Sequence, residues 1–207
     1  MKVWAVPILH PSYIMRGQWA LEPAQVAYLK RALKIAKGWD PPLEDVTACP
    51  PGCVLQPTLG DLDDWRTGLE GCADRRVAAD LECAGPVLLG VGLMRFEDEV
   101  GIYVPFRHHL ADTYWRTYKD CGKAAVWLDG VLSDPTIPKV FQNGQAFDVP
   151  YLQDIGFEVQ GYEDDTMIMQ HVAYPEMPKG LEYLGILYAG LPAWKWLAKV
   201  ADQGDGK

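Results

Sequence analysis

The sequence contains no run of apolar residues long enough to cross a bilayer, which takes roughly 18–20 consecutive residues. Its opening, MKVWAVPIL, is too short for the apolar segment of a signal peptide and is interrupted by Pro7. No small-residue cleavage site follows it. We therefore expect neither a membrane-spanning nor a secreted protein, but a soluble one in the cytoplasm.

Positive charge is also scarce. The 207 residues include 19 Lys and Arg against 28 Asp and Glu, which gives a formal net charge of −9. Such a protein is not expected to bind nucleic acid through a broad basic surface. It can still act on nucleic acid, because an active site that holds divalent cations concentrates carboxylates, and the metal ions reverse the local sign of the charge.

Cysteines are too few and too scattered for a disulfide framework. There are five, and Cys49 and Cys53 are the only close pair. A zinc site would need a second pair of ligands at suitable spacing, which His108-His109 does not supply. We expect free thiols in a reducing compartment.

The residue pattern divides the chain into three parts, at 1–39, 40–73 and 74–207. In the first part, an apolar run at residues 2–9 predicts a strand. A helix is predicted to start at Glu22-Pro23 and to end before Gly38. The second part is rich in proline, and we interpret it as a linker ending in a short helix through Trp65.

The third part predicts an α/β domain. Three apolar runs with short joints predict an antiparallel meander of strands at residues 76–83, 87–96 and 100–106. A further short strand is predicted at residues 139–142. Helices are predicted at residues 111–119, 124–132, 147–155, 166–172 and 179–187. Three meander strands followed by alternating helix and strand indicate a mixed sheet, with antiparallel and then parallel strands, flanked by helices.

Two acids lie together in the first strand of this domain. Asp80 and Glu82 are two residues apart, so both side chains project from the same face of the strand. Their charges repel each other unless a cation lies between them, and hard oxygen ligands suit Mg²⁺ or Mn²⁺. Taken alone, a pair of surface acids at a strand exit is the simpler interpretation.

A second polar segment follows the predicted strand at residues 139–142. Asn143 would lie at the end of this strand and Asp148 at the start of the next helix, where the helix N-terminus supports an acid. The alternative is an Asn-Gly turn followed by a capping aspartate.

Together the two segments resemble the first and second motifs of the DEDD superfamily of 3′→5′ exonucleases, which have a ribonuclease H-like fold. The matching residues are Asp80-x-Glu82 and Asn143-x-x-x-Phe147-Asp148. The run from Asp165 to Leu184 is similar to the proofreading domains of family-A DNA polymerases, including those of phages. The resemblance covers about residues 74–195, and it implies a bacterial or phage-infected cell.

The resemblance implies that two Mg²⁺ or Mn²⁺ ions hydrolyse phosphodiester bonds at the 3′ ends of single-stranded DNA or another nucleic acid. The catalytic residues and metal ligands that it implies are Asp80, Glu82 and Asp148. The residues that it implies on the substrate side are Asn143, Phe147 and Cys83. The family usually has Thr or Ser in place of Cys83. For Phe147, packing in the core is favoured over stacking on a base, and Asp165 is expected to cap a helix.

The superfamily's last motif, Tyr-x-x-x-Asp or His-x-x-x-Asp, is missing. No Tyr or His after Asp148 has an aspartate four residues later, and Asp202 and Asp205 lie in a polar tail. Activity is therefore expected to be impaired, unless Asp202, Asp205, a DNA polymerase or a second subunit supplies the fourth acid. The alternative function is an inactive module of the same fold that binds nucleic acid or assembles with a polymerase.

Residues 10–17, HPSYIMRG, resemble the C-terminal motif of thermostable-type uracil-DNA glycosylases. The likeness covers about 35 residues and lacks the water-activating motif, so residues 1–39 are interpreted as a remnant without glycosylase activity. An ordinary strand, turn and helix is the alternative. The apolar helix face formed by Val26, Leu29 and Leu33 must pack against the nuclease domain or against a second copy in a homodimer.

Overall fold

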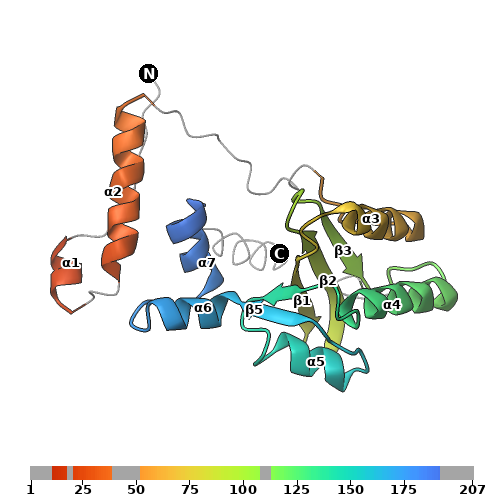
Figure 1. Ribbon diagram of the computed structural model, residues 1–207. Helices are drawn as coiled ribbons and strands as arrows, with labels where there is room; N and C mark the ends of the chain where they lie inside the picture. The colour runs from red at the N-terminus through yellow and green to blue at the C-terminus, as the bar shows by residue number, and fades with distance from the viewer. Residues whose placement is uncertain (1–10, 18–20, 39–51, 108–112, 192–207) are drawn as a thin grey trace, which may run out of the picture. The chain divides into compact units, whose positions relative to one another are not determined.

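The computed structural model describes residues 11–17, 21–38, 52–107 and 113–191 (Figure 1). It divides the chain into two compact units, Cys49–Ile168 and a second that combines Met1–Ala48 with Met169–Lys207. The predicted strand at residues 2–9, Cys49 and the two tail aspartates lie outside the described residues. Among the residues described, no helix is long and apolar enough to span a membrane.

A five-stranded mixed sheet forms the centre of the unit Cys49–Ile168, in the spatial order β3-β2-β1-β4-β5. The strands are β1 Val77–Ala84, β2 Val87–Arg95, β3 Gly101–Pro105, β4 Lys139–Phe141 and β5 Tyr162–Asp165. The first three form an antiparallel meander. β4 then pairs parallel with β1, and β5 pairs parallel with β4. This arrangement confirms the predicted α/β fold with a mixed sheet flanked by helices.

Among the described residues, the helices α3 Leu59–Gly71, α4 Tyr118–Leu132 and α5 Asp148–Asp154 belong to the same unit as the sheet, and α6 Thr166–Ala173 begins in this unit and ends in the second. Figure 1 shows α3 and α4 side by side, and residues of the two helices are in contact. Fully buried apolar side chains from α3, α4 and the meander form one core, which includes Leu62, Leu69, Val77, Val91, Val104, Leu128 and Val131.

Helix α3 is longer than predicted. α3 does not stop at Trp65 but continues to Gly71, because Leu62, Trp65 and Leu69 recur at helical spacing and are all buried. A capping box between Thr58 and Asp61 starts it. α3 thus belongs to the same compact unit as the sheet, although residues 40–73 had been interpreted as a linker. The predicted boundaries at residues 39 and 73 stay a prediction.

The helix predicted at residues 111–119 is wrong over its described part. Residues 113–117 are not helical, and Thr113 instead forms an isolated bridge with Arg107. α4 begins only at Tyr118, where the Thr117 side chain accepts a hydrogen bond from the Asp120 N–H, and runs without a break through the predicted helix at residues 124–132.

The second unit contains α1 Pro11–Met15, α2 Glu22–Ala36, α7 Leu181–Leu184 and the π-helical turn η2 Gly185–Ala189. α2 has the predicted bounds, whereas the predicted turn around residues 10–17 contains the short helix α1. Val26, Leu29 and Leu33 of α2 are between 40% and 60% exposed. Packing of this apolar face against the unit that contains the sheet, or against a second copy, stays a prediction.

One buried charge makes the stability of the sheet depend on pH. Lys139 of β4 is fully buried, and its Nζ donates a hydrogen bond to the Asp134 carbonyl oxygen at 2.5 Å. Burial lowers the pKa of Lys139 from 10.5 to about 8, although the nearby Asp134 charge acts in the opposite direction. Between these two pH values the unfolded chain binds more protons than the folded one, so this residue makes stability rise with pH.

We therefore expect the free energy of unfolding of the wild type to rise, relative to Lys139→Met, between pH 8 and pH 10.5. Urea denaturation at a series of pH values measures the difference. Lys123→Met is the control, because Lys123 lies exposed on α4, where it pairs with Asp120. If the wild type and Lys139→Met changed in parallel over this range, the buried lysine would not be the cause.

Candidate active site

Asp80 and Glu82 lie on one face of β1, beside a part of the sheet that carries no side chain. In the register of β1 and β2, Asp80 is opposite Gly92 and Glu82 is opposite Gly90. Side chains two residues apart share a face of the sheet, so both acids border a strip of bare backbone. Both acids are exposed to solvent.

Tyr103 of β3 covers part of this strip. It pairs with Gly92, and a Cβ atom added at Gly90 would overlap its ring carbon Cζ and its hydroxyl oxygen, so the ring lies across Gly90. Partial burial and then the charge of Glu82 raise the pKa of Tyr103. The sequence analysis missed Tyr103. The signal that could have found it is Gly-x-Gly at residues 90–92, in register with Asp-x-Glu.

Asp148 is held against the backbone between the two acids of β1. It is the first residue of α5 and only 3% exposed, and its Oδ1 accepts a hydrogen bond from the Leu81 N–H at 3.2 Å. Burial raises the pKa of Asp148, the Leu81 hydrogen bond partly opposes this, and the charges of Asp80 and Asp165 raise it further. The structure thus brings together the segments that carry the three predicted catalytic acids.

The charges of the two β1 acids are also disfavoured. Although both side chains are exposed, the surrounding protein removes part of their hydration, and this raises the pKa of Asp80 and of Glu82. The charge of Asp80 raises the pKa of Glu82 further. A cation beside these groups would lower all three pKa values, because it favours the ionised forms.

Asn143 contributes through its backbone. It has a left-handed conformation with a φ of 64°, and its N–H donates to Oδ1 of Asp165 at 3.0 Å. The same carboxylate accepts from the N–H groups of Met167 and Ile168 and from the Tyr162 hydroxyl. Asp165 therefore caps α6, as predicted, and also fixes the turn that leads to Asp148.

The two remaining predicted substrate residues flank the acids. Phe147 is 47% exposed, so the interpretation that favoured core packing is wrong. Its ring lies 6.0 Å from that of Tyr151, between ring centres. Cys83 is partly buried and follows a break in the strand register directly after Glu82. It is a free thiol, as are Cys72 and Cys121.

The three acids have the chemistry of ligands for divalent cations, but their side chains do not converge on one metal position. The three carboxylates form a hard-oxygen donor set suited to Mg²⁺ or Mn²⁺, and the charge of Asp80 raises the pKa of both Glu82 and Asp148. Within the described ranges, however, no three side chains of His, Cys, Asp or Glu converge closely enough to hold a metal ion. Asp165 is a further acid whose charge acts on Asp148, but its carboxylate accepts hydrogen bonds from Asn143, Tyr162, Met167 and Ile168.

Residues 58–201 match the family model DNA_pol_A_exo1, described as a 3′-5′ exonuclease. The chain belongs to this 3′-5′ exonuclease family. The matched range begins at the N-cap of α3 and includes the sheet and all three acids. A comparison with curated protein sequences finds no match.

Solved structures with a similar fold include RNase D from two organisms. RNase D of Trypanosoma brucei is 17% identical, with a TM-score of 0.52 over 75% of this chain and 54% of that one. RNase D of Escherichia coli, an exoribonuclease involved in structured RNA processing, is 20% identical, with a TM-score of 0.50 over 70% of this chain and 36% of that one. This chain thus covers about half the length of the T. brucei protein and about a third of the E. coli protein. The likeness supports the ribonuclease H-like fold.

The glycines beside the acids give a stability prediction for this exonuclease domain. Gly90→Ala is expected to lower the free energy of unfolding by about 1–3 kcal/mol, because the added Cβ overlaps the Tyr103 ring and lies 2.8 Å from the Val104 carbonyl oxygen. Gly92→Ala is the matched control, since its Cβ would meet only the Asp80 carbonyl oxygen, at 3.7 Å. Equal urea midpoints for the two variants would contradict the described position of Tyr103.

Proposed function

We propose that the chain removes nucleotides from the 3′ ends of single-stranded nucleic acid by hydrolysis that depends on Mg²⁺ or Mn²⁺. Asp80, Glu82 and Asp148 are the proposed ligands. The observation that carries the proposal is the hydrogen bond from the Leu81 N–H to Asp148, which fixes a buried acid between two others in a member of a 3′-5′ exonuclease family.

Each residue has a defined task in this proposal. Asp148 is immobilised by burial and by the Leu81 N–H, so it sets the position of the ligand group. Asp80 lies opposite Gly92, which the Tyr103 ring leaves uncovered, so a sugar and phosphate can approach the backbone closely there, and Glu82 lies opposite Gly90 beside that ring. The metal ions, when bound, activate water and stabilise the leaving 3′ oxygen.

The substrate of the proposed activity is DNA or RNA. The family model carries a DNA polymerase name, whereas one similar structure is T. brucei RNase D in complex with RNA U12, 19% identical with a TM-score of 0.51 over 72% of this chain and 50% of that one. Both polymers therefore belong in the test. A bacterial or phage-infected cell is the proposed setting, with a DNA polymerase or a second subunit as the proposed partner.

The test is digestion of 5′-labelled single-stranded DNA and RNA with Mn²⁺, Mg²⁺ or EDTA. The wild type is compared with Asp80→Ala/Glu82→Ala. We expect stepwise shortening from the 3′ end with metal, none with EDTA, and none with the double variant. Shortening that persists in the double variant would refute the assignment of these acids.

A second candidate is an inactive nucleic-acid-binding module of the same fold. It is favoured by the missing last motif, and by the absence of three converging ligands among the residues described. If neither protein shortens the oligonucleotide, although both are folded by circular dichroism, this candidate replaces the first. Activity that appears only when a polymerase is added, or that rises with protein concentration, would instead identify a partner or a second copy as the source of the fourth acid.

A further inference from the structure

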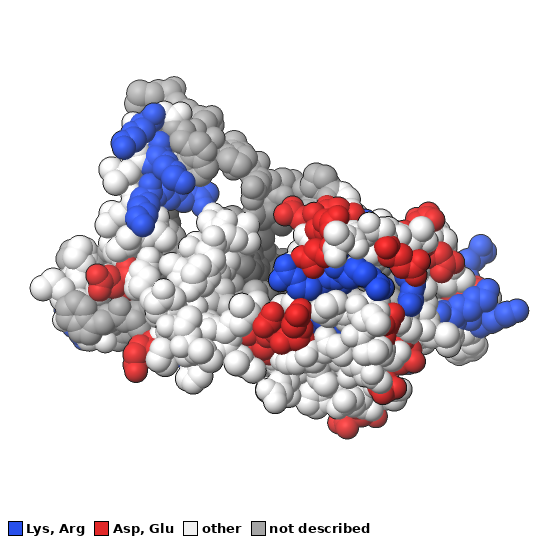
Figure 2. Space-filling view, viewed as in Figure 1, with Lys and Arg blue, Asp and Glu red and all other residues white. Residues whose placement is uncertain are grey.

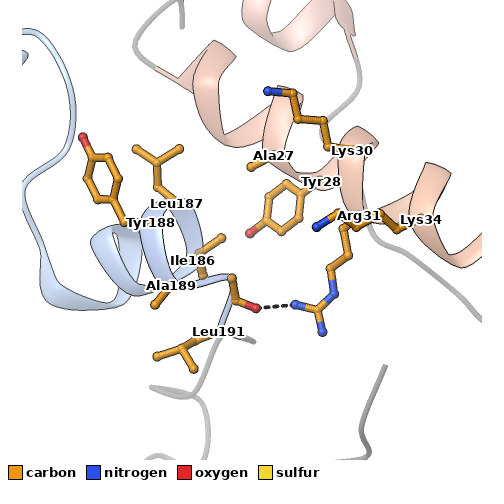
Figure 3. A pocket seen from close by; sticks show the side chains of 11 residues that line it. Ala27, Tyr28, Lys30, Arg31, Lys34, Ile186, Leu187, Tyr188, Ala189 and Leu191 are labelled. Carbon is orange, nitrogen blue, oxygen red and sulfur yellow. Dashed lines mark hydrogen bonds between the residues drawn. The ribbon is translucent and has the colours of Figure 1, made fainter. Parts of the chain in front are cut away.

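We propose that α2 and η2 form a second nucleic-acid site, in the unit that does not contain the carboxylates, and that this site binds the phosphate backbone of a single strand. The class of ligand rests on the proposed function, whereas the site itself rests on the structure of the unit that contains α2 and η2. These elements form a pocket of about 330 Å³ (Figure 3).

Three cations line this pocket from one side of α2. Lys30, Arg31 and Lys34 recur at spacings of one, three and four residues, and with Ala27 they form one face of the helix. The rest of the described lining comes from Tyr28 and from residues 186–191, and none of the lining residues that the structure describes is an acid. Figure 2 shows Lys and Arg side chains gathered along α2, in a chain with a net charge of −9. This local excess of positive charge therefore suits an anion.

The cations are not explained by helix stability alone. The only acid in α2 is Glu22, in its first turn, and only Lys34 lies in the last turn, where a cation stabilises the helix dipole. Lys30 and Lys34 are four residues apart, so their charges repel each other along the helix.

The pocket also has a fixed wall and an aromatic ring. The Arg31 Nη1 donates to the Gly190 carbonyl oxygen at 2.5 Å, which joins α2 to the end of η2. In Figure 3 the ring of Tyr28 points from α2 toward η2. Cations beside an aromatic ring are typical of sites that bind single strands through the backbone, with bases stacking on aromatic side chains.

Fluorescence anisotropy with 5′-labelled oligo-dT and oligo-U in EDTA tests the site without hydrolysis. Lys30→Gln/Lys34→Gln is compared with the wild type, and Arg31 is left in place because it holds Gly190. We expect Kd to rise by about tenfold, and the dependence of log K on log salt to become shallower by roughly 1.4, or 0.7 for each lost phosphate contact.

The control variant Lys119→Gln/Lys123→Gln removes the same charge from exposed positions of α4 and is expected to keep the Kd of the wild type within about twofold. Lys30→Arg/Lys34→Arg keeps the charge and is expected to keep binding. Equal weakening in the α4 control, no weakening in Lys30→Gln/Lys34→Gln, or no binding by the wild type would each overturn the site.

The two proposals fail separately. Hydrolysis of the p-nitrophenyl ester of thymidine 5′-monophosphate, with Mn²⁺, reports on the carboxylates with a substrate too small to need a second site. We expect Lys30→Gln/Lys34→Gln to hydrolyse it at the rate of the wild type. If the wild type does not hydrolyse the ester, but Lys30→Gln/Lys34→Gln binds the oligonucleotides more weakly than the wild type, the exonuclease proposal is overturned and the second site stands. If the wild type hydrolyses the ester, but the variant binds the oligonucleotides as tightly as the wild type, only the second site is overturned.

Discussion

Asp148→Asn is expected to abolish nuclease activity while making the metal-free protein more stable. The buried carboxylate has a raised pKa, because burial and the charges of Asp80 and Asp165 disfavour its ionised form. An amide of the same shape removes that repulsion, and its oxygen can still accept from the Leu81 N–H. A metal ligand contributes several kcal/mol to the transition state, so the rate should fall on the order of a hundredfold or more.

Two measurements on one sample check this result. Urea denaturation in EDTA gives the stability, and shortening of 5′-labelled DNA with Mn²⁺ gives the rate. The stability gain should shrink as pH falls, because the wild-type carboxyl becomes protonated below its raised pKa. Asp154→Asn, at the exposed end of the same helix, is the control and should change neither. If Asp148→Asn were less stable than the wild type and fully active, the assignment of Asp148 to the active site would be wrong.

Asp165→Ala is expected to lower the free energy of unfolding by about 3 kcal/mol or more, because buried donors that lose their acceptor cost about 1–3 kcal/mol each. The carboxylate is 3% exposed and serves three N–H groups and the hydroxyl of Tyr162. Activity should fall as well, since the turn that Asp165 fixes carries Asp148.

The pH dependence of stability distinguishes the loss of these hydrogen bonds in Asp165→Ala from a simple loss of packing. Burial alone would raise the pKa of Asp165, but hydrogen bonds from Asn143, Tyr162, Ile168 and Met167 together hold it below 3.8. Its stabilisation is therefore complete above that pH and is lost as pH falls through the lower folded value. The difference in the free energy of unfolding between the wild type and Asp165→Ala should therefore become smaller as the pH falls below 3.8. Glu163→Ala, exposed on the same strand, should cost less than about 0.5 kcal/mol.

The sheet and its acids were predictable because their signals are local. The meander strands are apolar runs with short joints, and Asp80-x-Glu82 lies inside the first of them. The alternation of side chains along a strand then fixes which face both acids share. The start of α5 at Asp148 likewise follows from the polar turn before it.

What the sequence analysis missed depends on partners distant in the chain. β5 reads Tyr-Glu-Asp-Asp and has no apolar alternation, and it forms a strand because β4 offers an edge to pair with. Tyr103 belongs to the site only through the register of β3 on β2, which no local pattern gives. The exposure of Phe147 likewise depends on how α5 packs, because Phe is among the residue types most often buried and no local pattern marks this one as exposed.

The break in register after Glu82 limits how this strand can change during evolution. Up to Glu82, β1 and β2 pair residue by residue, so that each acid meets a glycine, and the irregularity between Glu82 and Cys83 takes up the mismatch beyond. One residue inserted or deleted between Val77 and Glu82 would turn the acids to the opposite face. Substitutions are therefore tolerable along β1 where changes of length are not, and alignment gaps among functional relatives should fall after Glu82 rather than before it.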